Sequence, residues 1–232
     1  MDTEKLTRTL DTFSREKGAD LFGVADLAPA ADFISSHGDP IATGYPRAVS
    51  IGMQLNSAIV DGHDPDEPRG KSLYWHHVYN VVSEALNRVA YDVSRWLIGQ
   101  GFDALPVPAS EPYNRQTLQG IISNKLPAHL AGLGWIGKNC LLLTEEFGPR
   151  VRFVTILTNA PLTTGTMVDK SCGKCSICVE ACPVSAFTGV AFDPSEDVNV
   201  RFDTFRCHEY RQEHPCGRCV SSCPKGHGKR RG

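Results

Sequence analysis

The sequence has 232 residues, of which 41% are hydrophobic and 22% are charged, and its formal net charge is -2. These are ordinary values for a globular protein, and a chain of this length buries about 70% of its unfolded surface, so no metal is needed to supply a core. The charge balance excludes a global attraction to nucleic acid or anionic lipid. No apolar run reaches the roughly 18 residues of a membrane span, and Met1–Lys17 lacks a signal-peptide core, so we expect a cytoplasmic protein with no membrane partner.

Apolar residues at helical spacing predict helices, and short apolar runs bounded by glycine or polar residues predict strands. In chain order, the expected elements are a helix over Leu6–Phe13, strands over Leu21–Ala25 and Val49–Leu55, an exposed loop over Asp61–Gly70, a long helix over Ser72–Leu97, a strand over Phe102–Val107, a helix over Gln116–Leu130, and a hairpin of Cys140–Leu143 with Val151–Leu157 turning at Glu145–Gly148. Strands and helices mix without strict alternation. We therefore expect an α+β sandwich domain over residues 1–165, joined through Asn159–Val168 to a small cysteine-rich domain over residues 166–232 with a short basic tail.

Eight of the nine cysteines lie in the C-terminal third of the chain. Cytoplasmic thiols stay reduced, so clustered cysteines indicate metal ligands rather than disulfides. The first four and the following proline reproduce the C-x2-C-x2-C-x3-C-P run of bacterial two-cluster ferredoxins, in which the fourth cysteine ligates the other cluster. The second motif is less regular, with one cysteine separated by eight residues from a C-x2-C-x3-C-P ending.

This cross-over predicts two closed sites for two 4Fe-4S clusters. The first thiol set is Cys172, Cys175, Cys178 and Cys223, and the second thiol set is Cys182, Cys207, Cys216 and Cys219. A pair of zinc sites is the alternative, although zinc calls for neither a third cysteine two residues on nor two Cys-Pro endings. Cys140, the ninth cysteine, is expected to be a small buried residue.

The segment Ala131–Cys140 reads AGLGWIGKNC and continues as LLLTEEFGPRVRFVTILTNAPL before the first cysteine motif, CGKCSICVEACP. Its glycines alone indicate only tight turns or close approach of the backbone to a flat group, and packing within a hairpin is the alternative. Together, these segments resemble the epoxyqueuosine reductase family of corrinoid-dependent iron-sulfur enzymes, whose core is shared with reductive dehalogenases.

The resemblance implies a nitroreductase-like α+β domain that carries a base-off cobalamin, followed by a ferredoxin-like domain that feeds electrons to the cobalt. The matched motif implies cofactor-lining residues in the glycine-rich segment, and two residues just upstream are further candidates. The motif residues are Gly132, Gly134, Trp135, Gly137, Lys138 and Asn139, and the upstream candidates are Lys125 and His129.

The chain departs from this family in two respects. The resemblance ends at the second cysteine motif, so we expect the chain to lack the further C-terminal domain that the family uses around tRNA. The family also implies an aspartate proton donor shortly before the glycine-rich segment, yet there is no Asp between Asp103 and Asp169, and Glu111 is the one carboxylate between Asp103 and Leu143. Glu111 is thus the candidate catalytic acid, with a solvated loop charge as the alternative.

These observations lead us to expect an oxidoreductase that passes single electrons from its clusters to a bound corrinoid and on to a small-molecule substrate. An external electron donor is implied, and tRNA is expected to be an unlikely partner because broad phosphate contacts need a broad positive surface. A ferredoxin-type carrier, a reductive activator of a corrinoid protein, and a flavin-binding iron-sulfur reductase are the alternatives.

Overall fold

The computed structural model describes residues 2–110, 114–193 and 196–226, which form two compact units. Unit 1 consists of Met1–Met53, Val82–Leu133 and Arg152–Val168, and unit 2 consists of Gln54–Val81, Gly134–Val151 and Asp169–Gly232. The chain therefore passes several times from one unit to the other. The expected domain boundary between residues 165 and 166 stays a prediction; it lies close to the last of these passages.

Unit 1 is built on a four-stranded sheet in the order β1-β2-β6-β3. The strands are β1 (Leu21–Asp26), β2 (Arg47–Gln54), β3 (Ala104–Val107) and β6 (Val151–Thr158). The neighbouring strands β2 and β6 are distant in sequence. The pairs β1–β2 and β3–β6 are antiparallel. The predicted α+β class is confirmed, and these four strands fall within two or three residues of their expected positions.

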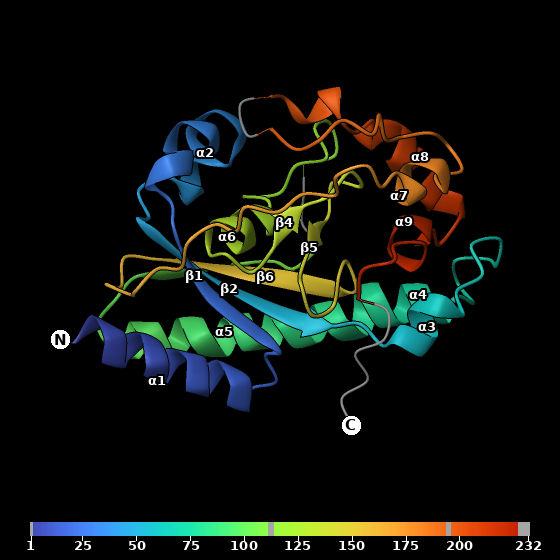
Figure 1. Cartoon of the computed structure of the whole chain (residues 1–232). Helices are drawn as coiled ribbons and strands as arrows, with labels where there is room; N and C mark the ends of the chain where they lie inside the picture. The colour runs from blue at the N-terminus through green and yellow to red at the C-terminus, as the bar shows by residue number, and fades with distance from the viewer. Residues whose placement is uncertain (1, 111–113, 194–195, 227–232) are drawn as a thin grey trace. The chain divides into compact units, whose positions relative to one another are not determined.

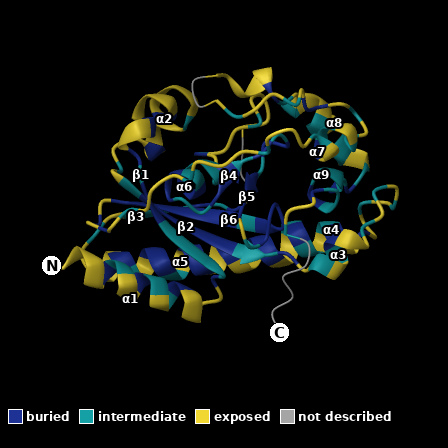
Figure 2. Cartoon of the chain, in the orientation of Figure 1, coloured by how far each residue is buried: buried dark blue, intermediate teal, exposed yellow. Residues whose placement is uncertain are grey.

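Helices cover both faces of this sheet. The helices α1 (Thr3–Glu16) and α5 (Val82–Gly99) lie together on one face, and α6 (Lys125–Leu130) lies on the other (Figure 1). The strands are largely buried, while α1 exposes its outer side (Figure 2). On the α6 side, buried residues from β1, β3 and α6 form one apolar cluster. Residues of α1 and α5 fill the opposite side.

The first helix shows how the sequence starts this unit. The Asp2 carboxylate accepts hydrogen bonds from the backbone N–H groups of Glu4 and Lys5, which satisfies donors that a helix start leaves unpaired. Leu6 and Leu10, four residues apart, are buried on one face. The chain turns at Gly18, whose φ of 103° favours glycine, and continues into β1.

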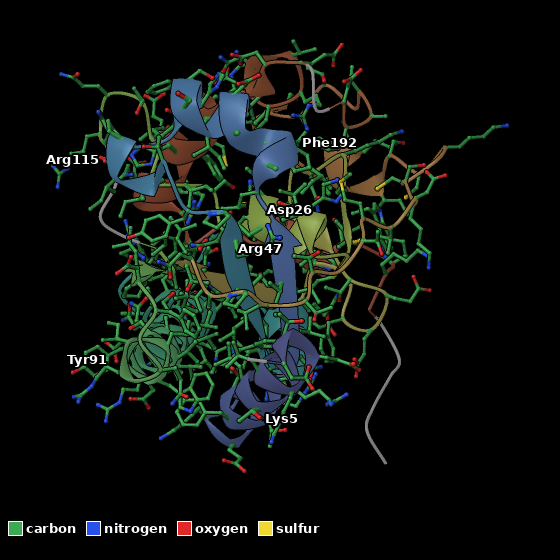
Figure 3. The ribbon with its side chains drawn as sticks, turned by 90° about the vertical axis from the view of Figure 1, so that its left-hand side faces the viewer. Lys5, Asp26, Arg47, Tyr91, Arg115 and Phe192 are labelled. Carbon is green, nitrogen blue, oxygen red and sulfur yellow. The ribbon has the colours of Figure 1, made fainter. Side chains whose placement is uncertain are left out.

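A cross-strand ion pair closes the end of the β1–β2 ladder. Asp26 and Arg47 are register partners on the two strands, and the Arg47 Nη1 lies 2.9 Å from the Asp26 Oδ1. The two side chains point toward each other at the edge of the sheet (Figure 3). Both side chains are partly exposed, so the ion pair contributes modestly to stability. Its main effect is to favour the strand register in which Asp26 lies opposite Arg47.

The long helix expected over Ser72–Leu97 is confirmed with one difference. It consists of α4 (Leu73–Trp75), a π-helical turn η3 (His76–Val81) and α5. The apolar stripe that predicted it continues through the π turn from Val78 to Leu97. A π turn adds a residue to one helical turn, which an apolar spacing pattern does not reveal.

Two expected elements are wrong. The helix expected over Gln116–Leu130 is only α6, because the segment before it forms a turn closed by a bridge between Asn114 and Gln119. The hairpin expected from Cys140–Leu143 and Val151–Leu157 does not form. Instead β5 (Leu142–Leu143) pairs with β4 (Trp135–Ile136) in a separate two-stranded sheet. The intervening turn is closed by the Gly137 N–H, which donates to the Leu141 carbonyl oxygen at 2.9 Å.

Unit 2 contains this small sheet and several short helices. Its helices, apart from α4 and η3, are α3 (Ser57–Asp61), α7 (Ile177–Glu180), η4 (Val198–Val200), α8 (Thr204–Glu213) and α9 (Arg218–Ser221). The helix α9 packs against both α3 and α7 (Figure 1). The remaining short elements, η1 (Ala28–Ala30), α2 (Ala31–His37) and η2 (Pro40–Ala42), belong to unit 1. Among the described residues, no helix has both the length and the apolar character needed to cross a membrane.

A buried arginine holds the last cysteine turn of unit 2. The Arg150 side chain is 1% exposed, and its Nη2 lies 2.6 Å from the Asp61 Oδ1 at the end of α3. Its guanidinium also donates to four carbonyl oxygens at 3.2–3.4 Å, which belong to Val220, Ser221, Cys223 and Lys225. Arg150 thereby satisfies carbonyl groups that the end of α9 leaves without helical partners.

We expect Arg150→Met to lower the free energy of unfolding by about 2–4 kcal/mol, because it leaves buried carbonyl groups and Asp61 without their donor. Arg88→Met is the control, since the Arg88 side chain is 78% exposed and its i,i+4 pair with Asp92 contributes about 0.5 kcal/mol or less. Urea denaturation of anaerobically purified protein measures both. Equal losses in the two variants would show that the buried guanidinium is not a structural support.

Candidate functional site

The eight clustered cysteines occupy three short helices and the loops beside them in unit 2. The helices α7, α8 and α9 carry Cys178, Cys207 and Cys219. All eight are free thiols. Cys178 and Cys223 are buried, whereas Cys175 is exposed, so the first thiol set reaches the surface of unit 2 at one corner.

The thiols of the first set lie close enough to influence one another. Burial, followed by the neighbouring thiols of Cys223, Cys172 and Cys175, raises the pKa of Cys178 to about 11. These three neighbours are the partners that the ferredoxin-type cross-over assigns to Cys178. The last cysteine of the second motif therefore lies near the first three of the first motif, and the assignment of these four thiols to one cluster stays a prediction.

The second set behaves in the same way. Burial raises the pKa of Cys207, the Arg211 guanidinium opposes this rise, and the thiols of Cys216 and Cys182 add to it. Burial also raises the pKa of Cys219. The neighbouring thiols of Cys216 and Cys207 raise it further, and the thiol of Cys178, from the first set, makes a smaller contribution. The two sets are thus distinct groups that approach each other through Cys178 and Cys219.

Backbone N–H groups donate hydrogen bonds to the sulfur atoms of the two Cys-Pro turns. The Ala186 N–H donates to the Cys182 Sγ at 3.3 Å, and the Cys223 sulfur has a backbone donor at Lys225. Such donors stabilise negative charge on thiolates and their clusters. Among the described residues, no three Cys, His, Asp or Glu side chains are grouped as a site for one metal ion. The donor set of four thiols per group, with backbone N–H groups at the sulfurs, fits an iron-sulfur cluster.

The glycine-rich segment of unit 2 packs directly against the cysteine loops. A Cβ on Gly137 would lie 2.5 Å from the Leu143 Cδ1 and 3.4 Å from the Cys172 Sγ. The Asn139 side chain is buried; its Nδ2 donates to the Cys219 carbonyl oxygen at 3.0 Å, and its Oδ1 accepts from the Leu141 N–H at 3.2 Å. One short segment therefore touches cysteine loops of both thiol sets.

Gly134 and Trp135 also have packing partners inside unit 2. A Cβ on Gly134 would overlap the carbonyl oxygen of Leu143, so only glycine fits between the two strands there. Trp135 is 3% exposed, and the Lys170 Nζ lies 5.9 Å above its ring. Lys138 is partly buried. The cofactor roles expected for these residues stay predictions.

The other predicted cofactor residues lie in unit 1. Lys125 and His129 are four residues apart on α6 and so share one helical face. Gly132 has a φ of 76°, and a Cβ there would overlap the Thr166 carbonyl oxygen. Glu111, the expected catalytic acid, lies outside the described residues. The structure thus places these residues without testing their roles.

Sequence reasoning missed the arginines beside the thiols, among them Arg150 and Arg211. Arg150 lies far upstream of the cysteine motifs, and its contact with Cys223 has no signal in a single sequence. Arg211 follows Cys207 by four residues on α8, so the helical i,i+4 spacing could have indicated it.

The presence of two thiol sets agrees with the family model that matches this part of the chain. A model described as a 4Fe-4S dicluster domain matches residues 171–227. The match supports iron-sulfur clusters as cofactors of this segment.

Curated relatives confirm the resemblance expected from the sequence. The epoxyqueuosine reductase of Bacillus anthracis is 32% identical over 117 residues, which cover 47% of this chain and 31% of the relative. That of Leadbetterella byssophila is 32% identical over 155 residues, which cover 66% of this chain and 50% of the relative. The matched segment thus spans about a third to a half of the length of these relatives.

Solved structures confirm the fold over nearly the whole chain. A crystal structure of epoxyqueuosine reductase with an epoxyqueuosine-modified stem loop of tyrosine tRNA matches with a TM-score of 0.64 at 17% identity, covering 97% of this chain and 66% of that chain. A reductive dehalogenase whose dehalogenation is described as B12-dependent matches with a TM-score of 0.74 at 18% identity, covering 98% of this chain and 32% of that chain. The same fold therefore occurs in both kinds of enzyme.

The expectation that tRNA is an unlikely partner is wrong. Relatives named epoxyqueuosine reductase and the solved complex with a tRNA stem loop contradict it. The net charge of -2 is a sum over the whole chain, whereas phosphate contacts depend on local groups. A low net charge therefore does not exclude a nucleic-acid surface.

We expect Gly134→Ala to lower the free energy of unfolding by about 1–3 kcal/mol, because the added methyl group forces β4 away from the Leu143 backbone. Gly70→Ala, in a loop of the same unit where an added Cβ meets no atom within 4 Å, is the control and should stay within about 0.5 kcal/mol of the unsubstituted protein. Urea denaturation of the anaerobic protein compares them. A Gly134→Ala variant as stable as Gly70→Ala would contradict the close packing of β4 on β5.

Proposed function

We propose that this chain is the redox core of an iron-sulfur oxidoreductase that acts like epoxyqueuosine reductase on a modified nucleoside of tRNA. The observation that carries the proposal is the grouping of eight thiols into two sets inside the segment matched by the dicluster model. The names of the curated relatives support the reaction class, and the stem-loop complex supports tRNA as the substrate.

In this proposal the first and second thiol sets each hold one 4Fe-4S cluster, which supplies single electrons at low potential. The residues around the sulfurs bury them and donate hydrogen bonds to them. The exposed Cys175 marks the corner at which an external electron donor can approach the first set. Removal of an epoxide oxygen as water requires two electrons and two protons, so each turnover draws two such transfers.

A corrinoid is the second cofactor that we propose. The fold shared with a B12-dependent dehalogenase supports it, and so does the packing of the glycine-rich segment beside Cys172. The glycines keep the backbone compact, which leaves Lys138 as the side chain of this segment that can meet a polar group of the cofactor. Lys125, His129 and Gly132 remain proposed cofactor residues on the family resemblance, and Glu111 remains the proposed acid.

We expect anaerobically purified protein to contain about eight iron and eight sulfide, since each of two clusters holds four of each. Cys178→Ala should lower both contents by about half. Cys140→Ala, which removes a buried thiol outside both sets, should leave them unchanged. Zinc at two equivalents with no sulfide in oxygen-protected protein would exclude the iron-sulfur assignment.

The substrate and second cofactor are tested in one reaction. Reduced, cobalamin-loaded protein should convert the epoxyqueuosine of a tRNA stem loop to queuosine in a single-turnover reaction. Mass analysis of the nucleosides measures the product. Glu111→Gln should slow this step by about 10²- to 10⁴-fold if its carboxyl group supplies the proton. The control is Glu4→Gln, whose side chain is 70% exposed on α1 and should not affect the rate.

No queuosine from cobalamin-loaded protein with intact clusters would contradict the proposed reaction. Product formed with flavin and not with cobalamin would contradict the corrinoid. Binding of neither cofactor would instead favour a ferredoxin-type electron carrier.

A further inference from the structure

The side chain of Arg211 lies beside the second thiol set. It follows Cys207 by one helical turn on α8, and its charge acts on the thiols of both Cys207 and Cys219. The Arg211 Nε is buried and has no hydrogen-bond partner. The partly buried guanidinium group of Arg211 therefore lies beside the thiols of the second set.

Two aromatic rings hold this guanidinium. Trp75 and Tyr79, one turn apart across the junction of α4 and η3, stack with their ring centroids 4.2 Å apart. The Arg211 Cζ lies 5.2 Å from the Trp75 centroid and 4.9 Å from the Tyr79 centroid. Arg69 also lies over Trp75, with its Cζ 3.8 Å from the ring centroid. Ring faces attract cations without neutralising them.

Three arginines act on the thiols of the two sets, and they differ in their counterions. Arg150, beside Cys223, forms a 2.6 Å ion pair with Asp61. Within the described part of the chain, Arg211 forms no ion pair with a carboxylate; its contacts are the two rings. The charge of Arg211 is therefore not paired with a carboxylate of the described residues, whereas Arg150 is paired with Asp61. Arg218, which also acts on Cys216 of the second set, lies 3.9 Å from Asp66.

A partly buried cation without a carboxylate partner changes the affinity of a neighbouring cluster for an electron. Reduction adds one negative charge, which a nearby guanidinium stabilises more strongly where water does not screen it. The reduction potential of an iron-sulfur cluster depends on such charges and on its solvent exposure. Arg suits this position better than Lys, because its planar group stacks on aromatic faces and keeps its charge when buried.

We propose that Arg211 is a redox-tuning residue that raises the reduction potential of the cluster held by the second thiol set, and that Trp75 and Tyr79 fix its position. This inference rests on the proposed pair of clusters. It goes beyond the proposed function because it assigns different potentials to the two clusters through one side chain.

The test is a redox titration of anaerobic protein followed by electron paramagnetic resonance. Arg211→Met removes the charge and keeps a long apolar side chain, and Arg211→Lys keeps the charge. Arg206→Met is the matched control, because Arg206 precedes Cys207 on the same helix, pairs with Asp203 and has a side chain that is 57% exposed.

In Arg211→Met, the reduction potential of one of the two clusters should fall by about 59 mV. For a one-electron couple, this shift lowers the ratio of reduced to oxidised cluster about tenfold at a fixed potential. The other cluster, Arg211→Lys and Arg206→Met should each show less than half of this shift. A merely structural role for Arg211 does not predict that the potential shifts in one cluster alone, nor that it shifts in Arg211→Met and not in Arg211→Lys.

Iron and sulfide contents distinguish the remaining outcomes. Protein without iron-sulfur clusters in any variant contradicts the proposed function itself. Two intact clusters with unchanged potentials in Arg211→Met overturn the tuning role. Loss of one cluster in Arg211→Met but not in Arg211→Lys supports a requirement for the charge, whereas loss in both variants shows that Arg211 only packs and overturns the proposal.

Discussion

The buried guanidinium of Arg150 is the interaction on which the cysteine-rich unit depends. It connects the turn after β5 with the end of α3 and with four carbonyl groups around the last Cys-Pro turn. Cys223 belongs to the first thiol set, although it lies in the second motif. The pairing of cysteines that are distant in sequence therefore requires a fixed position for this turn, and Arg150 supplies it from outside both motifs.

The sequence predicts the strands of unit 1 and its long helix because their apolar periodicity is strong and local. It does not predict the partner of Leu142–Leu143, since two apolar residues can join either of two sheets equally well. Gly134 decides between them, because only a residue without a side chain lets β4 approach the Leu143 backbone. That contact is a tertiary property, which short apolar runs do not encode.

The candidate site divides in the same way. Cysteine spacing predicts the two thiol sets, because short loops limit which sulfurs can meet. The buried contact of Asn139 with the Cys219 backbone and the stacking of Arg211 on Trp75 join segments far apart in sequence, so spacing does not reveal them. The expectation about tRNA failed for a related reason: net charge describes the whole chain, whereas binding depends on where charges lie.

Mössbauer spectroscopy of anaerobic protein, purified from cells grown on iron-57, distinguishes two four-iron clusters held by crossed sets of thiols from other iron sites. The crossed sets predict that essentially all of the iron belongs to cubane clusters, and that Cys223→Ala and Cys207→Ala each remove a different one of two spectral components. Iron in single-ion sites would contradict the clusters. Loss of the same component in both variants would contradict the crossed assignment.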